Sequence, residues 1–214
     1  MTDAATRLDR VRAEIARAAR LSRRDPAEVT LVAVSKRRSV EASEALSVAG
    51  QRDFGESRVQ EAHDKWPALR AAYPDVRLHM IGQLQSNKAA DAAALFDVIH
   101  SLDRRSLLNA LAAAPHHKPT YVQVNVGKEE QKGGVALGDL PDFIAAVRAS
   151  DVPLAGLMAI PPIGLEPGPF FAFLDELARR HDVTGLSMGM SSDYVTAVGL
   201  GATVVRVGTA LFED

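Results

Sequence analysis

Apolar residues along this chain alternate between the spacing of helices and the spacing of strands. Near the N-terminus, Leu8, Val11 and Ile15 follow one helix face and arginines and acidic residues occupy the other, which predicts a helix over about residues 3–21. The pair Asp25-Pro26 marks a turn after this helix. Short runs rich in aliphatic and β-branched residues then predict strands. These runs cover residues 30–35, 53–55, 77–81, 97–100, 120–124, 154–158, 185–188 and 203–207.

The stretches between these runs have helical character. They cover residues 40–49, 56–71, a short segment after Gln85, 104–113, 140–149, 170–180 and 192–198. Strands that alternate with helices form parallel sheets, and about eight such units indicate a (β/α)₈ barrel. The competing doubly wound sheet usually has fewer strands, and a dinucleotide-binding version has G-x-G-x-x-G where this chain has Ser35-Lys36-Arg37-Arg38. The pattern therefore predicts an α/β fold, a TIM barrel that forms one domain over residues 1–214.

The composition narrows the classes of protein. Hydrophobic residues make up 47% of the 214 residues and charged residues 24%, as in ordinary globular proteins. The net charge of −2 gives no bulk attraction for nucleic acid or for an anionic membrane. The chain has no cysteine, which excludes thiolate catalysis and cysteine-rich zinc sites, and its histidines lack metal-ligand spacing. We therefore expect a cytoplasmic protein that uses neither metal, nucleic acid nor membrane.

Lys36 ends the first predicted strand, an apolar run that stops at an amine. A charge at the end of a buried strand costs free energy unless it has a task. Arg37 and Arg38 follow, and desolvation beside other cations lowers the pKa of a lysine. A neutral lysine amine attacks carbonyls and forms Schiff bases. Taken alone, this segment favours a lysine that simply extends into water, and the rest of the chain changes that balance.

Small polar residues follow the last two predicted strands, where barrels commonly bind phosphate. Ser191 is placed to cap a helix whose first N–H groups would face an anion. Gly208 allows close backbone approach, and Thr209 adds a hydroxyl. Each segment alone fits ordinary capping and a tight turn. Together they predict a phosphate-binding cup across the barrel mouth from Lys36.

Arg206 interrupts the apolar run of the last strand. A buried arginine needs an acceptor. That acceptor is either a ligand atom or a carboxylate such as Glu56, Asp103 or the Glu213-Asp214 pair. A lysine, a phosphate cup and a group that faces a ring are the parts that position pyridoxal phosphate.

Several motifs in one order resemble the pyridoxal phosphate homeostasis proteins, which are similar to the barrel domain of alanine racemase. The resemblance implies that Lys36 carries pyridoxal phosphate as an internal aldimine, that Arg206 faces the pyridine nitrogen, and that Ser191, Gly208 and Thr209 lie near the phosphate. The family usually has asparagine where this chain has Ser57. The motifs include Val32-Ala33-Val34-Ser35-Lys36, Phe54-Gly55-Glu56, His79-Met80-Ile81-Gly82, Leu186-Ser187-Met188-Gly189-Met190-Ser191 and Val205-Arg206-Val207-Gly208-Thr209.

The resemblance implies a non-catalytic carrier that buffers pyridoxal phosphate and delivers it to apoenzymes that depend on this cofactor. An amino acid racemase would use the same Lys36 but needs a proton donor on each face of a planar carbanion. In the similar racemases a tyrosine from a second domain supplies the other face. This chain ends at Asp214, soon after the last strand, so we expect no second domain and a monomer. Tyr121 and Tyr194 do not stand at strand ends.

A Schiff-base aldolase that acts on a phosphorylated sugar is a third possibility. It explains Lys36 and the phosphate cup but gives Arg206 no role. We therefore expect a carrier rather than an enzyme.

Overall fold

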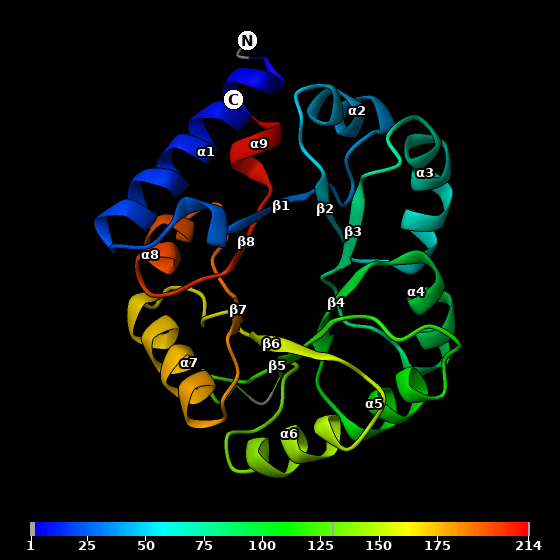
Figure 1. The fold of residues 1–214 in the computed structure, drawn as a ribbon, viewed down its shortest axis with the longest axis vertical. Helices are drawn as coiled ribbons and strands as arrows, with labels where there is room; N and C mark the ends of the chain where they lie inside the picture. The colour runs from blue at the N-terminus through cyan, green and yellow to red at the C-terminus, as the bar shows by residue number, and fades with distance from the viewer. Residues whose placement is uncertain (1–2, 130, 214) are drawn as a thin grey trace.

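Eight parallel strands close into a barrel in the computed structural model, which describes residues 3–129 and 131–213. Each strand pairs with the next along the chain, and the last pairs with the first, so the described sheet has no free edge (Figure 1). The predicted barrel is confirmed. The strands are β1 Thr30–Val34, β2 Asp53–Glu56, β3 Arg77–Met80, β4 Val98–Leu102, β5 Thr120–Gln123, β6 Leu154–Met158, β7 Gly185–Ser187 and β8 Val204–Val207.

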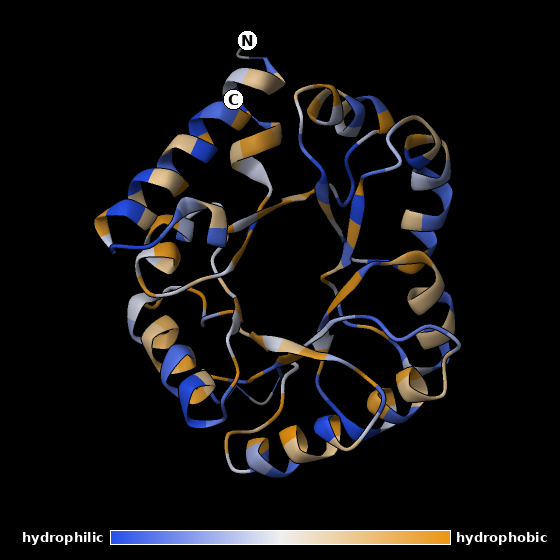
Figure 2. Ribbon diagram, viewed as in Figure 1, coloured by the Kyte–Doolittle hydropathy of each residue, from blue (hydrophilic) through white to orange (hydrophobic). Residues whose placement is uncertain are grey.

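The helices form a ring around the barrel, with their apolar faces turned towards it (Figure 2). Because both faces of a parallel sheet are covered, strand residues on the outer side are buried against this ring. The helices are α1 Ala4–Leu21, η1 Pro26–Glu28, α2 Val40–Val48, α3 Val59–Ala72, η2 Ser86–Lys88, α4 Ala89–Leu95, α5 Arg105–Ala112, α6 Leu140–Arg148, α7 Gly168–Arg180, α8 Tyr194–Gly199 and α9 Thr209–Phe212.

Helix α1 completes the ring beside the short helices that flank β8. It lies next to α9 and packs against α2 and α8 (Figure 1). Asp3 caps it by accepting a hydrogen bond from the N–H of Thr6 at 2.7 Å. After the C-terminal end of α1, Arg24 donates to the carbonyl of Val198 at 3.0 Å, which satisfies a C-terminal carbonyl of α8. The N-terminal helix and the segment after it are therefore tied to the helices beside β8.

The barrel interior is polar as well as apolar. A small cluster of Val32, Tyr121, Met158 and Val204 fills part of it. Four polar side chains are also buried there, each no more than 4% exposed: His79, His100, Ser187 and Arg206. The outer layer between strands and helices carries most of the apolar core, so the interior is free to hold a hydrogen-bonded network.

Several element boundaries differ from the sequence prediction by one to three residues, and two of them lie at the barrel mouth. The helix expected from residue 56 begins at Val59, because Glu56 continues β2 and its carbonyl accepts from the N–H of Ile81 at 2.9 Å. The helix expected from residue 192 begins at Tyr194, because Asp193 turns back to accept from the N–H of Met190 at 2.6 Å. Both shifts place polar residues in the connections at the barrel mouth.

No helix in the described ranges combines the length and hydrophobicity needed to span a bilayer. Nor do residues 3–129 and 131–213 bring together a group of acidic and histidine side chains that could hold a metal ion.

Candidate functional site

Lys36 lies just beyond the carboxyl end of β1, at the mouth where TIM barrels place their functional groups. Its side chain is exposed. It lines a cavity of about 360 Å³ whose walls come from the ends of neighbouring strands and from a loop, among them Ile81, Gln123, Asn125 and Lys132. The cavity therefore has an amine at its rim and both amide and aliphatic groups around it.

Of the two alternatives for Lys36, the structure shows the one that extends into water. Lys36 is exposed, and the two arginines that follow it contact acidic partners. The backbone N–H of Arg37 donates to the carboxylate of Glu61. The guanidinium of Arg38 pairs with Glu213 and lies 5.5 Å from the ring centre of Phe212. Lys36 is accordingly an accessible amine.

A buried cluster fixes the backbone immediately before Lys36. The carboxylate oxygen Oε1 of Glu56 accepts from the hydroxyl of Ser35 at 2.7 Å, from Nζ of Lys65 at 2.8 Å and from Nε1 of Trp66 at 3.0 Å. Lys65 also donates to the carbonyl of Ser35 at 2.8 Å. Glu56 is fully buried, and its second oxygen has no partner among the described residues. The end of β1 is thereby tied to α3.

Sequence reasoning missed this cluster because it placed Glu56 in a helix. The usable signal was the outward direction of alternate strand residues, which turns Ser35 and Glu56 towards the helix layer. The same layer holds Phe54, whose ring centre lies 4.8 Å from that of the buried Trp66. Trp66 is therefore a packing residue.

The connections after β7 and β8 meet at Ser191 and Gly208. The backbone N–H of Gly208 donates to the hydroxyl oxygen of Ser191 at 3.0 Å. The prediction that Ser191 caps a helix is therefore wrong, because the residue before α8 is Asp193. Thr209 is exposed at the start of α9. Among the described residues, neither the hydroxyl of Ser191 nor that of Thr209 donates a hydrogen bond, so both can donate to an anion.

Gly208 leaves space that the protein itself does not fill. A Cβ atom built there would have its nearest neighbour, Cβ of Val34, at 3.5 Å, which is ordinary van der Waals contact. The backbone of this glycine takes a negative φ of −111°. The neighbouring atoms would therefore admit a side chain here, which fits a position reserved for the close approach of a ligand.

Arg206 points into the barrel from β8 and is 4% exposed. Its guanidinium donates to the hydroxyl of Ser187 and, at 3.1 Å, to the carbonyl of Ala159. Burial lowers the pKa of Arg206 to about 10, so the group stays cationic at neutral pH.

None of the described carboxylates proposed as partners pairs with Arg206. Glu56 pairs with Lys65, Asp103 with Arg104 and Glu213 with Arg38, while Asp214 lies outside the described residues.

The five predicted site residues lie at the carboxyl ends of three adjoining strands. Lys36 follows β1, Ser191 follows β7, and Arg206, Gly208 and Thr209 end or follow β8. Val32 of β1 is in register with Arg206 of β8. The fold therefore gathers them on one side of the mouth.

Comparison with known proteins assigns this arrangement to a family. Residues 6–214 match the alanine racemase N-terminal domain. A pyridoxal phosphate homeostasis protein of Pseudomonas aeruginosa is 42% identical over 222 residues, covering 99% of this chain and 96% of the relative. One from Synechocystis is 40% identical, covering 88% and 93%. This chain belongs to the pyridoxal phosphate homeostasis proteins. The resemblance expected from the motifs is thereby confirmed.

Solved structures agree with this family and fold. The PipY protein of Synechococcus elongatus, with pyridoxal phosphate bound, is 39% identical with a TM-score of 0.75, covering 92% of this chain and 99% of PipY. The alanine racemase of Bartonella henselae is 16% identical with a TM-score of 0.74, covering 97% of this chain and 58% of the racemase. At that identity the racemase shows a shared fold only.

Proposed function

We propose that this member of the pyridoxal phosphate homeostasis family binds pyridoxal phosphate at the barrel mouth, with the aldehyde joined to Lys36 as a Schiff base. The observation that carries the proposal is that an accessible amine and the Ser191, Gly208 and Thr209 groups lie at the carboxyl ends of three adjoining strands. The cofactor would supply an aldehyde carbonyl and an electron-accepting ring. The relative PipY, solved with this ligand, supports the same choice.

Each group suits a different part of the ligand. The hydroxyls of Ser191 and Thr209 can donate to phosphate oxygens, and those oxygens can approach the backbone at Gly208 because it has no side chain. Arg206 can only donate hydrogen bonds, so it suits an unprotonated pyridine nitrogen. A cation at that nitrogen disfavours its protonation and weakens the ring as an electron sink.

We further propose a carrier rather than a racemase. The chain has three tyrosines, and none lines the cavity at Lys36. Tyr121 stacks on His100 inside the barrel, Tyr194 donates to Glu14 at 2.5 Å, and Tyr73 follows α3. No tyrosine is therefore placed at this cavity, among the described residues, to act as the second proton donor of a racemase. The protein would buffer the aldehyde as a cytoplasmic monomer and pass it to apoenzymes.

An absorbance spectrum of the purified protein, before and after borohydride, tests this proposal first. We expect a visible Schiff-base band that borohydride removes, and a pyridoxyl adduct on Lys36 by peptide mass mapping. A protein that stays colourless with added pyridoxal phosphate would overturn the proposed function. Incubation of the loaded protein with L-alanine, followed by chiral chromatography, separates the two alternatives, because a carrier leaves the amino acid unchanged.

Thr209→Val should weaken pyridoxal phosphate binding about tenfold without removing the covalent linkage, since a hydrogen bond to a charged group is lost. The change keeps the shape of the side chain. A titration followed by absorbance measures it. Thr196→Val, at an exposed position on α8, is the matched control and should leave the affinity unchanged. Equal affinities for the two variants would remove Thr209 from the phosphate site.

A further inference from the structure

A continuous chain of hydrogen bonds crosses the barrel interior and begins at Arg206. Arg206 donates to the hydroxyl of Ser187. The hydroxyl oxygen of Ser187 lies 2.8 Å from Nδ1 of His100, and Nε2 of His100 lies 2.9 Å from Nδ1 of His79. Nε2 of His79 lies 2.8 Å from a carboxylate oxygen of Asp53. The residues come from β8, β7, β4, β3 and β2, so the chain is a product of barrel closure.

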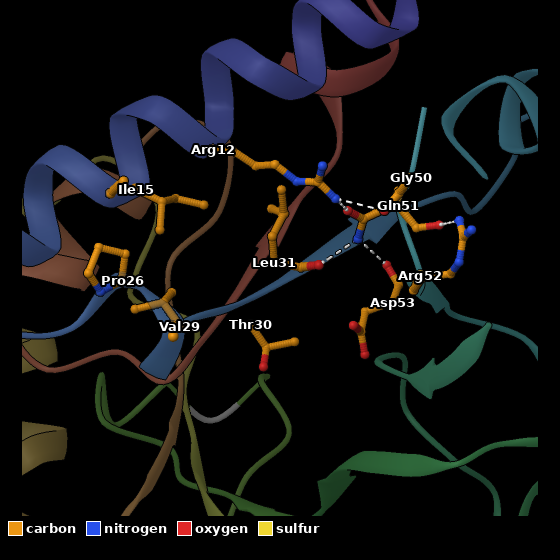
Figure 3. A pocket seen from close by; sticks show the side chains of 12 residues that line it. Arg12, Ile15, Pro26, Val29, Thr30, Leu31, Gly50, Gln51, Arg52 and Asp53 are labelled. Carbon is orange, nitrogen blue, oxygen red and sulfur yellow. Dashed lines mark hydrogen bonds between the residues drawn. The ribbon is translucent and has the colours of Figure 1, made fainter. Parts of the chain in front are cut away.

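Asp53 stands at the opposite end of the barrel from Lys36. It is the first residue of β2 and lines a cavity of about 500 Å³ beneath α1, together with Arg12, Thr30 and Gln51 (Figure 3). Arg77, whose side chain is exposed, forms an ion pair with Asp53 at 2.7 Å. The series of hydrogen bonds therefore connects the barrel mouth, where the ligand would bind, to a carboxylate near the opposite end of the barrel.

If both histidines are neutral, the two ends of this hydrogen-bonded series set the direction of every bond. An arginine can only donate and a carboxylate can only accept, so each group between them then accepts on one side and donates on the other. Ser187 thus donates to Nδ1 of His100, Nε2–H of His100 donates to His79, and Nε2–H of His79 donates to Asp53. Each neutral ring then carries its proton on Nε2.

The reverse direction leaves a buried donor without a partner. If His79 were doubly protonated, Ser187 would accept from both His100 and Arg206. Its own hydroxyl proton, fully buried, would then have no acceptor in the described part of the chain, at a cost of about 1–3 kcal/mol. Burial also lowers the pKa of His100 well below its usual value. Although burial opposes it, hydrogen bonds from His79 and Arg77 lower the pKa of Asp53, which keeps the far end anionic.

We propose that Ser187, His100 and His79 are positioning residues that hold Arg206 as a fixed cationic donor for the ring of the bound ligand. This inference rests on the proposed function, because it assigns the ring to Arg206. A carboxylate in direct contact with Arg206 would compete with the ligand for its N–H groups. The hydroxyl of Ser187 orients the guanidinium without that competition. The negative charge of Asp53 is separated from Arg206 by three side chains in the series of hydrogen bonds. Tyr121 stiffens the relay by stacking on His100, with ring centres 4.6 Å apart.

Three serine variants test the relay in the loaded protein. Ser187→Ala should weaken pyridoxal phosphate binding about tenfold and shift the visible absorbance band, because Arg206 loses its oriented acceptor. Ser187→Thr keeps the hydroxyl and should restore both properties. Ser101→Ala removes a buried hydroxyl on β4 that has no hydrogen-bond partner among the described residues, and should change neither. Wild-type affinity and band position in Ser187→Ala would overturn the inference, while a pyridoxyl adduct on Lys36 would still stand for the proposed function.

A second measurement is made on the wild-type protein without ligand. Nitrogen-15 NMR of ¹⁵N-histidine in the ligand-free wild-type chain reports the tautomer of each ring. The His79 and His100 signals are assigned by their disappearance in His79→Gln and His100→Gln. We expect both rings to be neutral with the proton on Nε2. A cationic His79, or a proton on Nδ1 of His100, would overturn the direction of the chain whether or not pyridoxal phosphate binds.

Discussion

Lys36→Ala should abolish covalent attachment of pyridoxal phosphate. A Schiff base requires a primary amine, and Lys36 presents one at the end of β1 beside the cavity. We expect the visible band to disappear and the borohydride-stable adduct to fall below detection in peptide mass mapping. Free ligand would retain only the contacts of its phosphate and ring, so its dissociation should become fast in a dilution experiment.

Lys132→Ala is the matched control for this result. Lys132 lines the same cavity, but its amine pairs with Glu129 at 2.7 Å. The variant should keep the band and the adduct on Lys36. A normal spectrum in Lys36→Ala, or an adduct that maps to Lys132 in the wild type, would contradict the assignment of the lysine.

Lys65→Met should destabilise the protein by about 3–5 kcal/mol, the usual cost of removing one partner from a buried ion pair. The methionine side chain fills nearly the same volume, so the loss comes from charge and hydrogen bonding rather than from a cavity. Glu56 would remain fully buried with only Ser35 and Trp66 as donors. Urea unfolding followed by circular dichroism measures the free energy of unfolding.

An exposed ion pair provides the control for this prediction. Arg180 pairs with Glu176 one helical turn away on α7, where both side chains are largely open to water. Arg180→Met should therefore change stability by no more than about 1 kcal/mol. If Lys65→Met proved equally mild, the Glu56 cluster would not be what secures the backbone before Lys36.

The order of elements was predictable because it depends on short-range periodicity. The strand at residues 30–35 and the helix at residues 3–21 each contain enough apolar positions at one spacing to identify their type. The residues at which helices and strands begin and end were less predictable, as Glu56 shows. An acidic residue at this position is typical of the first turn of a helix, yet hydrogen bonds from the buried Lys65 and Trp66 keep Glu56 in β2.

The sequence by itself determined the barrel, the family and the set of residues at the carboxyl ends of β1, β7 and β8. Alternation and strand order are local properties, and they place Lys36, Ser191 and Gly208 at one mouth. Only the tertiary structure decided which groups these residues meet. Periodicity tells that Arg206 and His100 face the interior, but not which inward side chains come into contact. That choice depends on the register of all the strands around the closed barrel and on the direction that a cation and a carboxylate impose on the hydrogen bonds between them.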